Sequence, residues 1–149
     1  MDGFPFVHTA RVRFEDLDSR GHVNNAVLAS YLEDARVEWY LASAGADEPA
    51  PMSYDVDMVL ARIEIDFRSE LRVFGETVVV GVRVGRIGTR SALLEYRVCS
   101  HDGRTVAEAK TVLVGFDFRR GVSAPIPERW MGRLTSAAGP RRAVTADSV

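Results

Sequence analysis

The sequence predicts an α+β fold in which one long helix packs on one face of an antiparallel sheet. The helical hydrophobic period occurs once, over residues 25–43. After a proline-containing segment, residues from about 63 to 118 follow the two-residue or uniformly apolar pattern of strands. Tight-turn signals such as Asp102-Gly103 separate these strands, because aspartate and glycine tolerate the positive φ that hairpin turns require.

A short strand and the long helix come first. Val12 and Phe14 alternate with arginines within residues 8–14, which indicates a strand. From Asn25 to about Ser43, apolar residues recur at three- and four-residue steps. They are Leu28, Tyr31, Leu32, Ala35, Trp39 and Ala42.

Four more strands are expected after a loop. Gly45 is expected to end the helix, and the run ADEPAPMS beyond it predicts the loop because its prolines continue neither regular element. The first strand alternates apolar with charged residues and so has one wet face, whereas the second is more uniformly apolar. The four strands are expected around residues 63–68, 75–85, 91–100 and 105–118.

One helix cannot cover both faces of a five-stranded sheet. The other face and any exposed edge strand need cover, which a second subunit could supply. The chain of 149 residues fits a single domain. Because apolar content falls toward the C-terminus, the domain is expected over 1–130 and a mobile tail over 131–149.

Composition gives no reason to expect nucleic acid or a membrane as partner. The net charge is −2 at pH 7, and no apolar run is long enough to span a bilayer. The N-terminus lacks the pattern of a signal peptide. The single cysteine, Cys99, is compatible with a reducing compartment and is expected to be a small core residue. We therefore expect a cytoplasmic protein.

The segment from Arg13 to Arg36 gathers polar groups directly ahead of the helix. Asn24 or Asn25 is the natural N-cap, and capping alone would explain those two residues. Capping does not require Asp18 and His22 within one turn of the cap. A helix N-terminus has free N–H groups that stabilise an oxyanion, so a nearby carboxylate suggests acyl transfer.

Two other interpretations of this segment remain open. Asp16 and Asp18 could simply form a solvated turn at the end of a strand. They could also bind a metal ion together with His22, but no second histidine or cysteine lies near, so no metal is expected.

The segment VRFEDLDSRGHVNNAVLASYLEDARVEWY resembles the signature of the hotdog-fold thioesterases, in the 4-hydroxybenzoyl-CoA thioesterase-like branch. The later RIEIDFRSEL, GETVVV and AEAKTVLVGFD are similar to that family too, so the resemblance covers residues 7–127. It implies a long central helix wrapped by a curved five-stranded antiparallel sheet.

The resemblance also implies residue roles. Asp18 matches the catalytic carboxylate, which acts as a nucleophile on the thioester or as a general base for water. Asn25 matches the donor of the backbone N–H that polarises the thioester oxygen. His22 matches an active-site histidine of the similar plant acyl-carrier-protein thioesterases, but Arg20 stands where those relatives carry asparagine.

The implied substrate is an acyl-CoA or acyl-carrier-protein thioester, and the reaction needs no cofactor. Asn24 is expected beside the substrate. Arg86 and Arg90 are expected to contact its phosphates, although both could simply be solvated hairpin charges. A homodimer or homotetramer with active sites at the subunit interface is implied.

Two alternatives to a thioesterase exist on the same fold. A non-catalytic acyl-CoA-binding module would need neither Asp18 nor His22. A hotdog dehydratase typically shows the pattern D-x-N-P-x-H, and the Asn-Pro pair is missing here.

Overall fold

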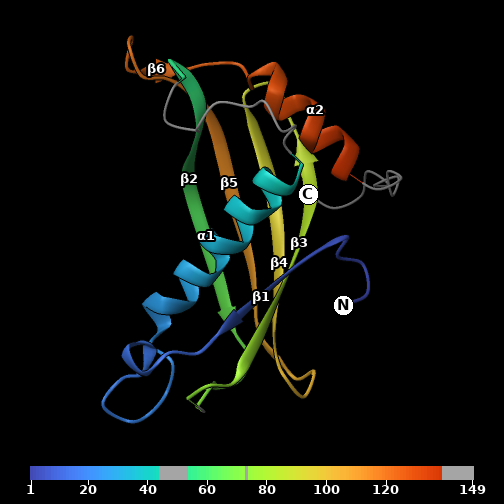
Figure 1. Cartoon of the computed structure of the whole chain (residues 1–149). Helices are drawn as coiled ribbons and strands as arrows, with labels where there is room; N and C mark the ends of the chain where they lie inside the picture. The colour runs from blue at the N-terminus through green and yellow to red at the C-terminus, as the bar shows by residue number, and fades with distance from the viewer. Residues whose placement is uncertain (44–53, 73, 139–149) are drawn as a thin grey trace, which may run out of the picture.

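The computed structural model describes residues 1–43, 54–72 and 74–138. Its main elements in chain order are β1 (Phe6–Arg11), a 3₁₀ turn (Phe14–Asp16), α1 (Asn25–Ala42), β2 (Val56–Phe67), β3 (Thr77–Ile87), β4 (Ser91–Ser100), β5 (Thr105–Asp117), β6 (Val122–Ser123) and α2 (Glu128–Ala137). The strands form one antiparallel sheet in the order β1-β3-β4-β5-β2, with β6 paired to β5. Figure 1 shows α1 lying across one face of this sheet, so the predicted α+β architecture is confirmed.

Helix α1 begins one residue after its cap. Asn24 is the N-cap, and its side-chain oxygen accepts a hydrogen bond of 2.9 Å from the N–H of Ala26. The helix ends at Ala42, which agrees with the predicted span. Gly45 and the predicted loop over 46–53 lie outside the described residues.

The core lies between α1 and the three central strands. The buried stripe of α1 meets a sheet surface on which every second residue is apolar and almost wholly buried. That surface is made by Val78, Val80 and Val82 of β3, Leu94 and Val98 of β4, and Ala107 and Leu113 of β5. Burying such side chains stabilises the fold by roughly 1.5–3 kcal/mol each, which fixes where the N-terminus of α1 lies.

Strand β2 is an edge strand whose inner face is only partly covered. We call its side chains Met58, Leu60, Ile63, Ile65 and Phe67 the β2 apolar row. Ile63 pairs with Thr111 and Phe67 with Ala107, both on the core side of β5, so the row faces the same side as α1. Yet Ile63 is 39% exposed and Phe67 49% exposed. A long apolar edge of this kind is a template for pairing with another chain.

The opposite face of the sheet carries ion pairs between strands. Arg83 of β3 contacts Glu95 of β4 at 2.6 Å, and Glu108 of β5 contacts both Arg68 at 3.1 Å and Arg97 at 3.5 Å. Charged side chains of this kind are stable in contact with water. The part of this face that carries the ion pairs therefore gives no support to the expectation that a second subunit must cover it. The β2 edge still needs cover.

Helix α2 was not predicted from the sequence. It follows Pro127, and its Leu134 is fully buried while Trp130 stacks on Tyr40 with ring centroids 4.2 Å apart. The domain boundary predicted at residue 130 therefore falls inside a packed helix that reaches Ala137. Residues 139–149 of the predicted tail lie outside the described residues. In the part of the chain that is described, neither helix could cross a membrane.

Candidate functional site

A tight loop carries Asp18 to the start of α1. The backbone N–H of Asp18 donates to the carbonyl of His22 at 2.7 Å, and that of Gly21 donates to the carbonyl of Asp18 at 3.0 Å. Gly21 has a φ of +75°, a conformation that glycine adopts at little cost. Leu17 and Val23 pair as a β-bridge below the turn. The loop is therefore a closed turn with Asp18 at its base.

The carboxylate of Asp18 is held by this turn. Its Oδ1 accepts hydrogen bonds from the backbone N–H groups of Arg20 at 2.8 Å and His22 at 3.0 Å. The bond from His22, followed by that from Arg20, lowers the pKa of Asp18 below its ordinary value. An exposed carboxylate with a lowered pKa is ionised at neutral pH, so it can act as a nucleophile or accept a proton.

Asp16 has a different environment. It is 1% exposed, and its Oδ2 accepts hydrogen bonds of 2.7 Å from both the Arg13 N–H and the Tyr31 hydroxyl. Burial opposes ionisation, but these bonds hold the pKa of Asp16 below its usual range. Burial, followed by the hydrogen bond to Asp16, raises the pKa of Tyr31. Asp16 thus ties the loop to α1.

The metal interpretation required Asp16, Asp18 and His22 to converge. Asp16 is instead engaged by Arg13 and Tyr31. Over residues 1–43, 54–72 and 74–138, no three His, Cys, Asp or Glu side chains form a group that could hold a metal ion.

The N-terminus of α1 opens beside Asp18. Because Asn24 caps Ala26, the cap leaves the N–H of Asn25 without an acceptor among the described residues. The backbone of Val23 donates to the Leu71 carbonyl at 2.8 Å, which attaches this end of the helix to the segment after β2. Unpaired N–H groups here carry the positive partial charge that attracts an oxyanion.

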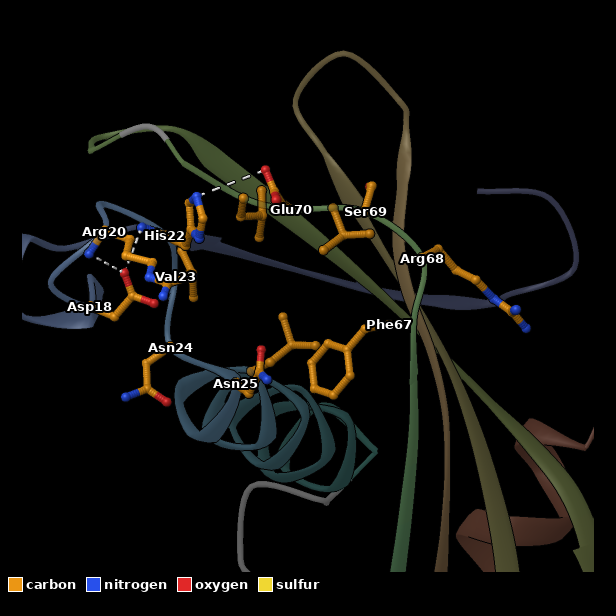
Figure 2. Close-up of a pocket in the computed structure, with 13 residues that line it drawn as sticks. Asp18, Arg20, His22, Val23, Asn24, Asn25, Phe67, Arg68, Ser69 and Glu70 are labelled. Atoms are coloured by element: carbon orange, nitrogen blue, oxygen red, sulfur yellow. Dashed lines mark hydrogen bonds and ion pairs between the residues drawn. The ribbon is translucent and has the colours of Figure 1, made fainter.

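The ring of His22 points away from Asp18. Its Nε2 lies 3.9 Å from Oε2 of Glu70, and only the backbone of His22 contacts Asp18. Figure 2 shows the ring turned toward Glu70, with Asp18 on the other side of the turn. No hydrogen bond links the His22 ring to the Asp18 carboxylate in the described structure.

A cleft of about 550 Å³ joins these groups to the end of β2. Four of the predicted site residues line it, namely Asp18, His22, Asn24 and Asn25. The far wall comes from residues 67–71 and Val106, which the sequence did not single out. Figure 2 shows Phe67 near Asn25 across this space. The one sequence feature that concerned this wall was that Phe67 ends the alternating pattern of β2. That pattern predicts a half-buried strand but does not indicate that Phe67 lines a binding cleft.

Arg86 and Arg90 are not brought to the cleft. Arg90 lies in the turn between β3 and β4 and donates from Nη1 to the Ser123 carbonyl at 2.7 Å. That turn is at the α2 end of the sheet, whereas the Asp18 loop is at the other end (Figure 1). The arginines that line the cleft within the protomer are Arg20 and Arg68.

The comparisons with solved structures agree with this architecture. A thioesterase from Thermus thermophilus, complexed with coenzyme A and Zn, is 35% identical, with a TM-score of 0.79 over 95% of this chain and 99% of that chain. The PA2801 protein from Pseudomonas aeruginosa is 30% identical, with a TM-score of 0.75 over 87% of this chain and 97% of that chain. The 1,4-dihydroxy-2-naphthoyl-CoA thioesterase Slr0204 from Synechocystis is 18% identical, with a TM-score of 0.80 over 91% of this chain and 98% of that chain, which shows the shared fold.

The predicted hotdog fold is therefore confirmed. No curated protein matches the chain in sequence. The model of the thioesterase-like superfamily matches residues 12–134, which include the whole Asp18 loop, the helix and the sheet from β2 to β6. This chain belongs to the thioesterase-like superfamily.

Proposed function

We propose that the protein hydrolyses an acyl-CoA thioester to the free acid and coenzyme A, with Asp18 as the catalytic carboxylate. The observation that carries the proposal is the placement of an ionised, fixed carboxylate in the same cleft as the open N-terminus of α1. Thioester hydrolysis needs these two things, a nucleophile or base and a donor for the developing oxyanion.

In this reaction the thioester oxygen faces the N–H of Asn25 while the carbonyl carbon lies toward Asp18. As a base, Asp18 accepts a proton from water as its oxygen adds to the carbonyl carbon, and the C–S bond then breaks to release the thiolate. As a nucleophile, Asp18 displaces the thiolate and forms an anhydride, which water opens. Oxygen-18 from water enters the Asp18 carboxylate only by the second route, if water attacks at Asp18.

Coenzyme A is the proposed carrier because a 35% identical relative is complexed with it. An acyl-carrier protein, which presents the same pantetheine thioester, is the alternative carrier. Arg20 lines the cleft and supplies positive charge, whereas Arg68, which also lines it, is paired with Glu108 at 3.1 Å. Arg86 and Arg90 remain proposed phosphate contacts only across a subunit interface, given their place at the far end of the sheet. Asn24 keeps its proposed place beside the substrate.

The proposed assembly is a homodimer in which the β2 edge pairs with that of a second copy. The exposed β2 apolar row supports this, since pairing would satisfy the backbone N–H and C=O groups of the edge strand and cover the row. A cytoplasmic location is part of the proposal, because Cys99 is buried as a free thiol.

The test is hydrolysis of a panel of acyl-CoA and aryl-CoA thioesters by wild type and Asp18→Asn. Loss of general-base assistance costs about 10²–10⁴-fold in rate. Asp34→Asn, an exposed aspartate on α1 outside the cleft, is the matched control and should keep wild-type activity. If wild type binds acyl-CoA but the thioester is recovered intact, the protein is a binding module. If it adds water to an enoyl-CoA, it is a hydratase.

A further inference from the structure

The turn that holds Asp18 also brings a guanidinium to the cleft. Arg20 is exposed and lines the cleft together with Asp18. After the backbone N–H groups of His22 and Arg20, the charge of Arg20 also lowers the pKa of Asp18. Over residues 1–43, 54–72 and 74–138, the Arg20 guanidinium takes part in no ion pair and no side-chain hydrogen bond, because only its backbone N–H donates to Asp18. Its charge can therefore meet a charge that develops in the cleft.

The other cationic side chains of the cleft are already engaged or turned away. Arg68 lies 3.1 Å from a carboxylate oxygen of Glu108. The Nε2 atom of His22 lies 3.9 Å from Oε2 of Glu70, and Figure 2 shows the ring turned toward that residue. Among the described residues that line the cleft, Arg20 is the cation that no carboxylate engages.

Hydrolysis of a thioester must expel sulfur as a thiolate. An alkyl thiol such as that of cysteine has a pKa of about 8.5, so its thiolate is the minor form at neutral pH. A thiol of higher pKa leaves more slowly. A protein speeds this step by giving the sulfur a proton or by placing a fixed positive charge where the negative charge develops. A guanidinium supplies the second, because it stays charged and presents several N–H donors.

The two walls of the cleft indicate the direction of the thioester. Phe67, Leu71 and Val106 give one wall apolar surface, whereas Asp18 and Arg20 belong to the polar turn. Figure 2 shows Phe67 on one side of the cleft and this turn on the other. An apolar acyl group is favourably buried against the apolar wall. With the acyl group there and the carbonyl carbon toward Asp18, the sulfur lies on the side of the turn.

The geometry points to Arg20 as a catalytic residue whose guanidinium neutralises the leaving thiolate. This inference rests on the proposed hydrolysis by Asp18 and adds a residue to it. As the C–S bond breaks, its electron pair stays on sulfur, and the guanidinium N–H groups donate to that sulfur without giving up a proton. The thiolate takes its proton from water after it leaves. Both routes at Asp18, as base or as nucleophile, pass through this cleavage.

The test compares wild type with Arg20→Met on S-aryl thioesters of one acyl group, whose thiols differ only in a para substituent. The slope of log(kcat/KM) against the pKa of the thiol reports the charge left on sulfur in the transition state. The slope should be shallow in wild type and steeper in Arg20→Met, because methionine cannot offset that charge. Arg20→Lys keeps a positive charge and should restore part of the shallow slope.

Acyl-CoA itself provides the second measurement. Its kcat should fall by about 10²-fold in Arg20→Met with little change in KM, which is the lower end of the cost of losing one donor to a developing anion. Arg20→Met should keep the wild-type free energy of unfolding in urea, because it breaks no ion pair among the described residues. Arg11→Met is the matched control, since Arg11 is also exposed and free of ion pairs among the described residues but lies on β1 outside the cleft. It should keep the wild-type slope and kcat.

The outcomes separate this inference from the proposed function. Equal slopes in wild type and Arg20→Met, or a wild-type kcat of Arg20→Met on acyl-CoA, would overturn the inference alone. An equal loss for every thiol would assign Arg20 to holding the turn, and a rise in KM confined to acyl-CoA would assign it to the nucleotide phosphates; either result overturns it too. A wild type that hydrolyses neither acyl-CoA nor the aryl thioesters would overturn the proposed function itself.

Discussion

The hydroxyl of Tyr31 donates a 2.7 Å hydrogen bond to the buried carboxylate of Asp16. This contact divides the roles of two aspartates that are two residues apart. Asp16 is used to fasten the loop to α1, whereas Asp18 points into the cleft with its carboxylate held by backbone N–H groups. The cleft therefore contains the Asp18 carboxylate on a loop that Asp16 attaches to α1.

Tyr31→Phe should destabilise the protein by about 1.5–3 kcal/mol at neutral pH, because a charged, buried acceptor loses a donor. The measurement is the free energy of unfolding in urea. Tyr96→Phe is the control, because the Tyr96 hydroxyl is buried beside Thr111 at 2.9 Å and Arg36, so its loss removes a buried hydroxyl that no carboxylate accepts from.

The same pair predicts a pH dependence. The folded pKa of Asp16 is lowered, so its stabilisation is present above the unfolded pKa and is lost as pH falls through the folded pKa. Tyr31→Phe raises the folded pKa and should move acid unfolding to higher pH. The midpoint of acid unfolding checks this, and a midpoint shifted as much by Tyr96→Phe would contradict it.

The lowered pKa of Asp18 predicts the pH profile of the reaction. Because His22 and Arg20 N–H groups favour the carboxylate, its reactive form persists below the ordinary aspartate pKa of about 3.9. We expect kcat/KM to be independent of pH from neutral down to about 5, with no acidic limb in that range. A limb between pH 5 and 7 on a fully folded protein would assign the essential base to another group.

Gly21→Ala should impair activity through the loop backbone alone. Its φ is +75°, and an added Cβ meets no atom within 4 Å, so the penalty is conformational, about 1–2 kcal/mol. Gly103→Ala is the matched control, with φ +82° and the same open space in the β4–β5 hairpin. Both should lose similar stability, but only Gly21→Ala should lower kcat. Equal kcat values would show that the turn does not position Asp18.

His22→Ala should retain most activity. The contact of Asp18 with residue 22 is made by the backbone, which alanine preserves. We expect kcat within about tenfold of wild type, against the 10²–10⁴-fold loss for a catalytic base. Glu70→Gln removes the carboxylate charge that lies 3.9 Å from the His22 ring and should change kcat even less. A His22→Ala loss equal to that of Asp18→Asn would assign His22 the catalytic role that the family resemblance implies.

Ile63→Cys should give a covalent dimer on oxidation if Ile63 lies on the twofold axis. Directly opposed residues in antiparallel strands have Cβ atoms about 4.5–5.5 Å apart, near the span of a disulfide. Non-reducing electrophoresis checks this. Val7→Cys, on the opposite edge strand, should remain monomeric on the gel, and cross-linking of Val7→Cys alone would move the interface to β1.

Local patterns determined much of the fold from the sequence. The stripe from Leu28 to Trp39 specified α1, because a helix must bury one face, and Asn24 was one of the two expected caps. The alternation of β2 and the Asp102-Gly103 turn likewise specified strands and a hairpin.

The tertiary structure decided which residues form the site. Asp16 and Asp18 look alike in sequence, and only packing against Tyr31 buries one of them. Phe67 and Val106 reach the cleft through strand pairing over long sequence separations. The open edge of β2 likewise depends on strand pairing and on where α1 packs. Such contacts depend on where whole elements pack, and no local spacing of residues encodes that position.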